Sequence, residues 1–218
     1  MIITSLAPAH KNKDSQLKAV ESWKRLGKRI VSVNHKSEIN DLEKDYDVEF
    51  VEPKKTGFDL FGKHYIPASE LVRLVRENGE GLIINSDIII KDLPAKRNNP
   101  VIFNRYDFND TLEGAKFFES GFDAFYLKSE HCDIPETRLC LGQCHWDYWL
   151  PLMLINKGFK LERSRRAHIF HKRHELQYSY ENWKKTATVF GYETGIRGSL
   201  QSISNKAFNL INSQITNI

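Results

Sequence analysis

The stretch Gly81-Leu-Ile-Ile-Asn-Ser-Asp-Ile-Ile-Ile90 places one carboxylate, Asp87, in an otherwise apolar run that also carries Asn85 and Ser86. An ionised carboxylate is costly to bury among aliphatic side chains unless a partner or a bound metal offsets its charge. Asp87 is therefore a candidate ligand for a hard cation. The alternative is a strand that ends at Ile84, followed by a turn, because Asn, Ser and Asp side chains bond to their own backbone.

Strand-like and helix-like segments alternate around this stretch through the first half of the chain, which is typical of a layered βαβ sheet. The run 81–90 is apolar on both faces, as in a central parallel strand covered by helices on each side. We therefore predict an α/β fold with a mixed, mainly parallel sheet flanked by helices. The expected strands are residues 2–6, 29–34, 48–52 and 81–90, and the expected helices are 15–26, 37–43 and 68–76.

Ligands of an open α/β sheet bind at the carboxyl ends of its strands. Because these ends meet at one edge of a parallel sheet, the segments that follow the strands can surround one small molecule. These segments are Ala7-Pro8, Asn34-His35, Glu52-Pro53 and Asn85-Ser86-Asp87.

Composition indicates an ordinary globular protein of one large or two small domains, with 218 residues, 40% hydrophobic and 28% charged. No apolar run reaches the roughly 20 residues of a membrane span, and the first residues lack a signal-peptide pattern. We therefore expect a soluble, cytoplasmic protein. Cys132, Cys140 and Cys144 fit a reducing compartment. They lie near His131 and His145 but lack the Cys-x-x-Cys spacing usual in structural zinc sites.

The formal net charge of +4 does not by itself indicate nucleic-acid binding, but the charge is unevenly distributed. Residues 157–173 carry seven Lys and Arg side chains against one acidic residue, Glu162, and include His168 and His171. This basic stretch is a candidate surface for phosphate groups. The alternative for the two histidines is a strand that turns one to solvent and the other to the core.

Three segments resemble nucleotide-sugar-dependent glycosyltransferases of the GT-A fold, which is Rossmann-like. They are Ile2-Ile-Thr-Ser-Leu-Ala-Pro8, Phe61-Gly-Lys-His-Tyr-Ile-Pro67 and Ile84-Asn-Ser-Asp-Ile88. The similarity runs through most of residues 1–175 and implies that these form the catalytic domain. Residues 176–218 show helical spacing of apolar residues and are expected to form a C-terminal helical extension that packs on the same domain or against a second copy.

The resemblance implies a divalent cation at the third segment. Members of the fold carry an Asp-x-Asp motif after the fourth strand, whose second Asp coordinates a cation that bridges the donor diphosphate. Here the motif reads Asn85-Ser86-Asp87, so Asp87 is the expected ligand of Mn²⁺ or Mg²⁺. One carboxylate attracts a dication less than two do, and a further donor is needed. The resemblance implies that His168 or His171 supplies it.

The implied donor is a nucleoside-diphosphate sugar, with a UDP-sugar as the first choice. Asp123 is expected near the donor sugar, and its alternative is a solvent-facing strand position. Arginines such as Arg166 would offset the charge of the diphosphate. The full set of expected donor contacts is Ser5, Ala7, Pro8, Asn34, Lys63, Asn85, Ser86, Asp123 and Arg166.

Asp147 stands where similar inverting enzymes place a general base, at the start of a helix below the acceptor. A carboxylate suits this role because it need only accept the proton of the attacking hydroxyl. The alternative is an acidic residue favoured by the helix dipole. Trp146, Tyr148 and Trp149 beside it suit stacking on sugars or bases, or else belong to the core.

The acceptor is less well defined. The compact domain and the basic stretch 157–173 favour double-stranded DNA with hydroxymethylated pyrimidines, as in compact GT-A enzymes that glycosylate such bases. A cell-surface saccharide acceptor and a non-catalytic sugar-nucleotide-binding module are the alternatives. Nucleotidyl transfer is a further option, but the first strand is not followed by a glycine-rich phosphate loop. A monomer and a homodimer, and retention and inversion, all fit the sequence.

Overall fold

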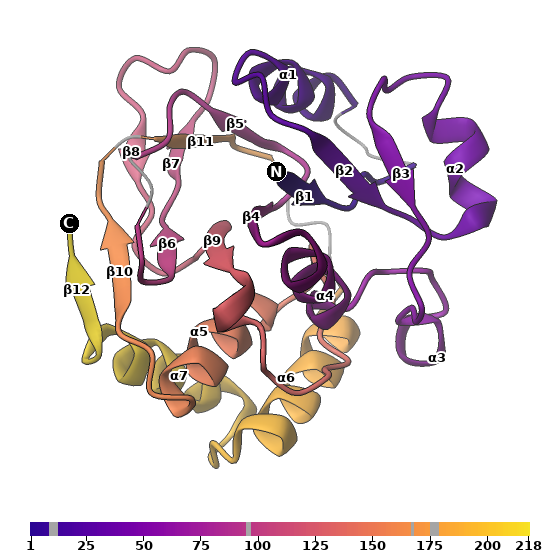
Figure 1. The fold of residues 1–218 in the computed structure, drawn as a ribbon. Coiled ribbons are helices and arrows are strands. Elements are labelled where there is room, and N and C mark those ends of the chain that lie inside the picture. The colour runs from indigo at the N-terminus through magenta and orange to yellow at the C-terminus, as the bar shows by residue number, and fades with distance from the viewer. Residues whose placement is uncertain (9–12, 95–96, 167, 175–178) are drawn as a thin grey trace.

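An eight-stranded sheet forms the centre of the molecule, with strand order β12-β10-β6-β9-β4-β1-β2-β3 (Figure 1). The computed structural model describes residues 1–8, 13–94, 97–166, 168–174 and 179–218. β9 runs antiparallel to both of its neighbours, and the other neighbouring pairs are parallel. The strands are β1 (Ile2–Thr4), β2 (Ile30–Val33), β3 (Glu49–Val51), β4 (Glu80–Ile84), β6 (Val101–Phe103), β9 (Ala124–Lys128), β10 (Leu161–Ser164) and β12 (Ile215–Asn217).

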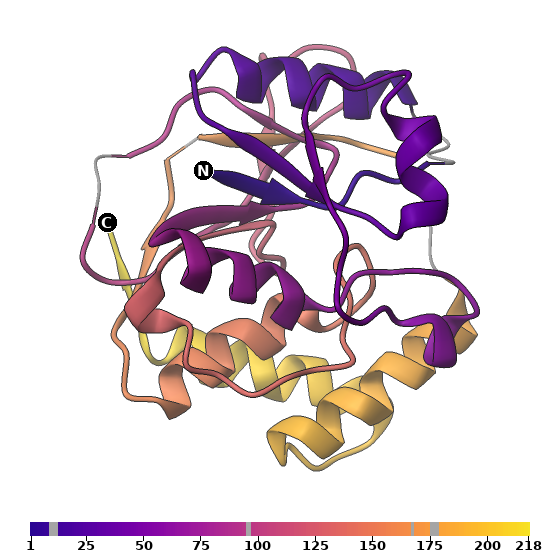
Figure 2. The same ribbon diagram turned by 45° about the vertical axis from the view of Figure 1, so that its right-hand side comes forward.

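Helices cover both faces of this sheet and make a three-layered molecule (Figure 2). α1 (Lys13–Lys24) lies on one face, and α4 (Ala68–Asn78) and α5 (Trp146–Asn156) lie on the other. The short helices α2 (Lys36–Leu42) and α3 (Phe58–Phe61) belong to the connections after β2 and β3. The arrangement confirms the predicted α/β class with a mainly parallel sheet flanked by helices.

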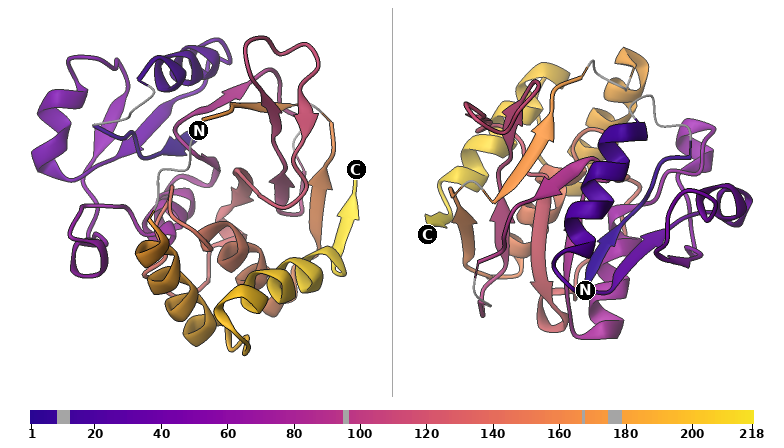
Figure 3. Two further views of the ribbon diagram at one scale, coloured as in Figure 1. Left: turned by 180° about the vertical axis from the view of Figure 1, so that it is seen from behind. Right: turned by 90° about the horizontal axis from the view of Figure 1, so that it is seen from above.

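The C-terminal segment packs on the same body. α6 (Tyr180–Thr194) and α7 (Leu200–Asn212) contact α5 and each other. β12 then pairs with β10 at one edge of the sheet, while β2 and β3 form the opposite edge (Figure 3). The division of the chain near residue 175 stays a prediction. Among the described residues, no helix is long and apolar enough to cross a bilayer.

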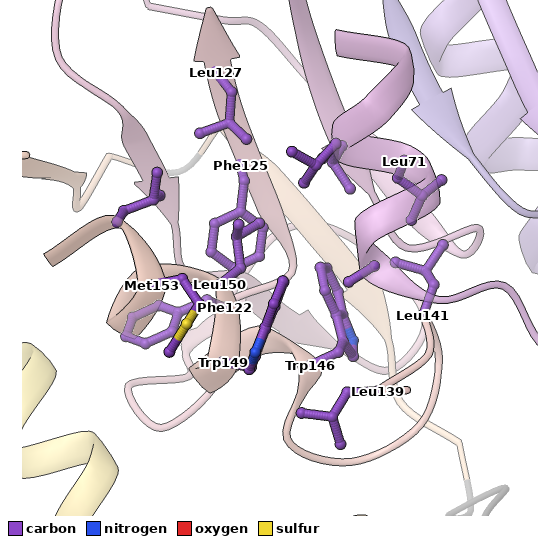
Figure 4. Packing of buried hydrophobic residues seen from close by; sticks show 14 of the residues in the cluster. Leu71, Phe122, Phe125, Leu127, Leu139, Leu141, Trp146, Trp149, Leu150 and Met153 are labelled. Carbon is purple, nitrogen blue, oxygen red and sulfur yellow. The ribbon is translucent and has the colours of Figure 1, made fainter. Parts of the chain in front are cut away.

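Side chains of the central strands alternate between two cores, as the pleat of a strand requires. Ile3 and Ile83 pack with α4 and α5, whereas Ile2 and Leu82 pack with α1. Figure 4 shows the first core, where the side chains of α5 meet the residues of β9. The Trp146 ring there contacts Phe125 edge to face, with centroids 5.3 Å apart. These cores fix the strand ends from which the polar residues of the next section project.

The predicted strand 81–90 is two strands, which corrects the sequence interpretation. β4 ends at Ile84, the chain turns at Ser86 and Asp87, and β5 (Ile88–Ile90) leaves for a second sheet. The turn forms because the Asn85 carbonyl accepts from the Ile88 N–H at 3.3 Å. The second sheet has the order β5-β11-β7-β8, with β7 (Tyr106–Phe108), β8 (Lys116–Phe117) and β11 (Ile169–Lys172).

Side chains of helix α1 form hydrogen bonds with the backbone groups at the outer edge of β5. The Trp23 indole N–H donates to the Ile88 carbonyl at 2.8 Å, and the Ile90 N–H donates to Ser22 Oγ at 2.9 Å. Trp23 is fully buried. Because an unpaired buried carbonyl is costly, these two bonds hold the strand that follows Asp87.

Replacing Trp23 with Phe keeps an aromatic ring in the core but leaves the Ile88 carbonyl without its donor. We expect the free energy of unfolding, measured in urea, to fall by about 1–3 kcal/mol. The exposed control Tyr192→Phe is expected to stay within about 0.5 kcal/mol of the parent protein. A Trp23→Phe variant as stable as the control would show that this bond does not hold β5.

Candidate functional site

A cavity of about 860 Å³ opens at the carboxyl ends of β1 and β4. Its wall includes the loop after β1, residues 62–66, the tripeptide 85–87 and the start of α5. Most of the side chains expected from the sequence line this one cavity: Ser5, Ala7, Pro8, Lys63, Asn85, Ser86, Asp87, Asp123, Asp147 and His171. The loop after β1 is held by Gln16, whose Oε1 accepts from the Ala7 N–H at 3.0 Å.

Three expected residues lie outside the cavity wall. Asn34 is buried and donates to the Leu6 carbonyl at 2.8 Å and to Glu38 at 3.1 Å, so that it braces the loop after β1. Arg166 is exposed. His168 pairs with Asp92 and contacts a core phenylalanine ring edge to face.

Asp87, His171 and His174 form a cluster of possible metal ligands in the cavity wall. Asp87 Oδ2 lies 3.1 Å from His174 Nε2 and 3.5 Å from His171 Nε2, and the two histidine nitrogens are 3.1 Å apart. Six ligands at about 2.1 Å from a cation are about 3 Å from their neighbours, so these spacings suit a shared ion. Within the described part of the chain, this is the one group of three or more such residues whose ligand atoms converge.

The pairing of strands explains why His171 meets Asp87. β11 runs antiparallel to β5 with His171 opposite Ile88, the residue next to Asp87. His174 follows two residues after the end of β11. On the other side of the ring, His171 Nδ1 lies 3.2 Å from Asp107 Oδ1 on β7. A carboxylate at this nitrogen fixes the ring orientation and leaves Nε2 toward Asp87.

Asp87 and His171 are both charged, because their contacts with each other and with neighbouring side chains have a larger effect on their pKa values than burial has. Burial favours a neutral Asp87, but hydrogen bonds from His171 and His174 hold its pKa well below the ordinary value. Burial likewise favours a neutral His171, but its contacts with Asp107 and Asp87 raise its pKa to about 9. The site therefore holds a carboxylate with positive charge beside it.

Arg105 joins this cluster to the other polar residues of the cavity. Its Nε donates to Asp107 Oδ1 at 2.7 Å, and its Nη1 donates to the two oxygens of Asp123 at 3.0 and 3.1 Å. Asp123 in turn accepts from Asn85 Nδ2 at 2.9 Å. The contacts close a ring that starts and ends in the tripeptide 85–87. Asn85 Oδ1 is buried and accepts no hydrogen bond from the residues that the structure describes, so this acceptor can serve a cation or a water molecule.

Asp147 is the second residue of α5, and its carboxylate lines the same cavity. The Phe122 N–H donates to its Oδ2 at 3.4 Å. Burial and the neighbouring charge of Asp123 raise the pKa of Asp147 to about 7. Of the three aromatic residues beside it, Trp146 and Tyr148 line the cavity, and Trp146 and Trp149 are buried in the core.

Sequence reasoning missed His174, Arg105 and Asp107. His171-Lys-Arg-His174 has a spacing that could have identified the second histidine, and Arg105-Tyr-Asp107 puts both charges on one side of a strand. Neither pattern is specific alone. Their meaning depends on the pairing of β11 with β5 and β7, which joins segments 60 or more residues apart.

The basic residues of the stretch 157–173 differ in their burial and in their partners. Arg163 is buried and donates to Asn212 and Asn217 at 2.7 and 2.9 Å, and so anchors the C-terminal segment. Lys157 pairs with Asp133 at 2.8 Å. The basic residues that stay exposed from the end of β10 onward are Arg165, Arg166, Lys172 and Arg173.

Comparisons with known proteins give weak likeness only. A scan against protein-family models and a search of curated proteins find no match. A structure from Bacillus anthracis, assigned as a glucose-1-phosphate thymidylyltransferase in complex with a sucrose, aligns with a TM-score of 0.41 and 11% identity, over 95% of this chain and 98% of that chain. A CTP:phosphocholine cytidylyltransferase from Streptococcus pneumoniae aligns with a TM-score of 0.38 and 13% identity, over 88% and 97%.

Both similar structures bear the names of nucleotidyltransferases. At these TM-scores the likeness carries no argument about activity, and the fold class above rests on the strand order. The reaction, the metal and the acceptor are therefore proposed on the residues of this chain and their geometry.

The raised pKa of Asp147 predicts how the free energy of unfolding depends on pH. The folded pKa of about 7 lies above the ordinary value of 3.8, so the stability that Asp147 contributes at low pH is lost as pH rises toward 7. Asp147→Asn removes this loss. We expect the variant to gain roughly 1–3 kcal/mol over the parent protein at about pH 8, and little at about pH 4.

Urea unfolding at the two pH values measures this difference. Asp59→Asn, at an exposed carboxylate of α3, is the matched control and is expected to show no such gain. An Asp147→Asn variant whose stability follows that of the parent at both pH values would contradict a raised pKa.

Proposed function

We propose that the protein is a metal-dependent glycosyltransferase of the GT-A type, which moves a sugar from a nucleoside-diphosphate sugar to an acceptor hydroxyl. One observation carries the proposal. A single cavity at the carboxyl ends of β1 and β4 contains both the Asp87-His171-His174 cluster and Asp147, a carboxylate with a pKa of about 7. A cation site and a base in one cavity are what transfer from a diphosphate to a hydroxyl requires.

The donor atoms of the cluster fit a divalent cation. Asp87 offers an oxygen, and His171 and His174 offer two imidazole nitrogens, of which that of His171 can bind a cation once the ring has released the proton that its raised pKa favours in the metal-free protein. Imidazole ligands suit transition metals better than Mg²⁺, so Mn²⁺ is the favoured ion. When bound, the cation would offset the charge of the donor diphosphate and of the leaving nucleoside diphosphate.

The rest of the cavity wall suits the donor. Ser5, Ala7 and Pro8 follow β1, and the exposed Lys63 ammonium can contact a phosphate. The Asp123 carboxylate is held in place by Arg105 and is assigned to the sugar. A UDP-sugar is the donor to test first.

In the proposed reaction Asp147 accepts the proton of the acceptor hydroxyl while the hydroxyl oxygen forms a bond to the anomeric carbon. The bond from that carbon to the diphosphate oxygen breaks, and its electrons leave with the nucleoside diphosphate. A pKa of about 7 leaves Asp147 ionised in a large fraction of molecules at neutral pH, while it stays basic enough to take a proton.

The favoured acceptor is DNA that carries hydroxymethylated pyrimidines. Support comes from the exposed basic residues Arg165, Arg166, Lys172 and Arg173, the last of which directly precedes the ligand candidate His174. Such residues can neutralise phosphates, with an affinity that falls as salt increases. A saccharide acceptor and a non-catalytic binding module are outcomes of the test below.

Metal binding tests the cluster separately from catalysis. We expect Mn²⁺ to bind more tightly than Mg²⁺ in calorimetry, and Asp87→Asn and His174→Ala each to weaken Mn²⁺ binding by about tenfold or more. Asp92→Asn changes an Asp-His pair outside the cavity and is expected to leave Mn²⁺ affinity unchanged. Equal Mn²⁺ affinities in all of these proteins would place the metal elsewhere.

Turnover tests the reaction itself. With a UDP-sugar, Mn²⁺ and a duplex containing 5-hydroxymethyluracil, we expect UDP release that Asp147→Asn lowers by about 100-fold or more in kcat without weakening donor binding. A set of simple saccharides replaces the duplex in a parallel assay. Donor binding without turnover on any acceptor would support a binding module, and pyrophosphate release from a nucleoside triphosphate and a sugar phosphate would support nucleotidyl transfer.

A further inference from the structure

Two residues of the C-terminal helices line the cavity and have no role in the reaction proposed above. Trp183 lies on α6 and Ser204 on α7, and both are half-buried. Both lie against His145, the residue before α5: its ring centroid is 6.3 Å from that of Trp183, and its Nε2 is 2.9 Å from Ser204 Oγ. The C-terminal extension thus contributes to the cavity as well as covering α5.

A chain of hydrogen bonds leads from Ser204 into the core. His145 Nε2 contacts Ser204 Oγ, and His145 Nδ1 lies 3.1 Å from Thr186 Oγ1. The Thr186 hydroxyl donates to the Trp183 carbonyl at 2.9 Å. Thr186 is fully buried and lies outside the cavity wall, so this end of the chain of bonds is out of reach of a ligand, whereas His145 is nearly buried and lies at the edge of the wall.

Counting protons favours one direction for each bond in the chain. Thr186 has one hydroxyl proton, and the Trp183 carbonyl can only accept. If His145 carries its proton on Nδ1, it donates to Thr186 and Thr186 donates onward, so both bonds form. If His145 Nδ1 carries no proton, the Thr186 hydroxyl can donate either to Nδ1 or to the Trp183 carbonyl but not to both. One hydrogen bond is then lost, which costs about 1 kcal/mol.

His145 is neutral under ordinary conditions, as this count requires. Burial lowers the pKa of His145 to about 4, and its ring stacks on Phe190 with centroids 5.2 Å apart. With the proton on Nδ1, Nε2 is an acceptor, and Ser204 must donate its one proton to it. The oxygen lone pairs of Ser204 are then what it presents to the cavity.

We propose that Trp183 and Ser204 form a subsite for the acceptor base, in which Ser204 accepts a hydrogen bond from a ring N–H of that base. The inference rests on the proposed function for the class of acceptor. Thr186 is a positioning residue, because it acts on the direction of the Ser204 hydroxyl through His145 and lies outside the cavity wall.

The direction of the Ser204 hydroxyl favours a base with a ring N–H over a sugar as the ligand of this subsite. A sugar hydroxyl can rotate so that it either donates or accepts a hydrogen bond. A Ser204 hydroxyl that can only accept would therefore not discriminate between one sugar and another. A ring nitrogen either carries a proton or does not. A base turned out of a duplex exposes that edge and can stack on an aromatic ring such as Trp183. The subsite therefore favours a uracil-type base, with a ring N–H, over a cytosine-type base, whose ring nitrogen is an acceptor.

Thr186→Val is the informative variant because residue 186 is fully buried and cannot touch the ligand. Valine has the same shape but accepts no hydrogen bond, so we expect the His145 proton to move to Nε2 and the Ser204 proton to turn to the cavity. Thr188→Val is the matched control, since Thr188 makes a similar bond to the Lys184 carbonyl on the exposed side of α6. Ser204→Ala removes the acceptor altogether.

Nitrogen NMR of His145 in the ligand-free protein gives the first readout. We expect the proton on Nδ1 in the parent protein and in Thr188→Val, and on Nε2 in Thr186→Val. A parent protein with the proton on Nε2 would overturn the inference, whatever the protein catalyses.

Binding of single-stranded oligonucleotides that carry one 5-hydroxymethyluracil or one 5-hydroxymethylcytosine gives the second readout. We expect the parent and Thr188→Val to prefer the uracil form by about tenfold, and Ser204→Ala and Thr186→Val to lose that preference. Equal affinities for both forms in the parent would overturn the subsite. Mn²⁺ and UDP-sugar binding, measured in the same proteins, are expected to stay unchanged, and their absence in the parent would instead refute the proposed function.

Discussion

The guanidinium of Arg105 is the contact on which the cavity depends, because it holds two buried carboxylates that would otherwise repel each other. Asp107 orients a histidine of the cluster of possible metal ligands, and Asp123 fixes Asn85 at the start of the tripeptide. The Arg105 guanidinium also lies over the Phe118 ring at 4.2 Å. A lysine could not bridge both carboxylates from fixed directions, so arginine is the residue that this geometry needs.

The same tripeptide serves as a turn and as part of the cavity wall. Asn85 and Ser86 end β4 and send β5 into a second sheet, and that change of sheet brings Asp87 beside β11. The two interpretations of Asn-Ser-Asp that the sequence left open are therefore compatible. The turn is what carries the carboxylate to the histidines.

Local sequence patterns were sufficient for the class of fold and for most of the cavity wall. Apolar runs located the strands, and the polar residues after β1 and β4 converge because parallel strands end at one edge. The break at residue 85, and the position of His171 in the cavity wall with His168 outside it, depend on strand pairing between distant segments, which no local pattern contains. The roles of Arg163, in the C-terminal anchor, and of His174 likewise appear only once β10 and β11 are in place.

A divalent cation and a nucleoside diphosphate are proposed to bind together at Asp87. A crystal structure with Mn²⁺ and UDP, phased to locate the manganese by its anomalous signal, tests whether they do. We expect one strong peak in contact with Asp87, His171 and His174, with the diphosphate oxygens beside it. Manganese bound away from these three residues, or UDP bound outside the cavity, would contradict the account.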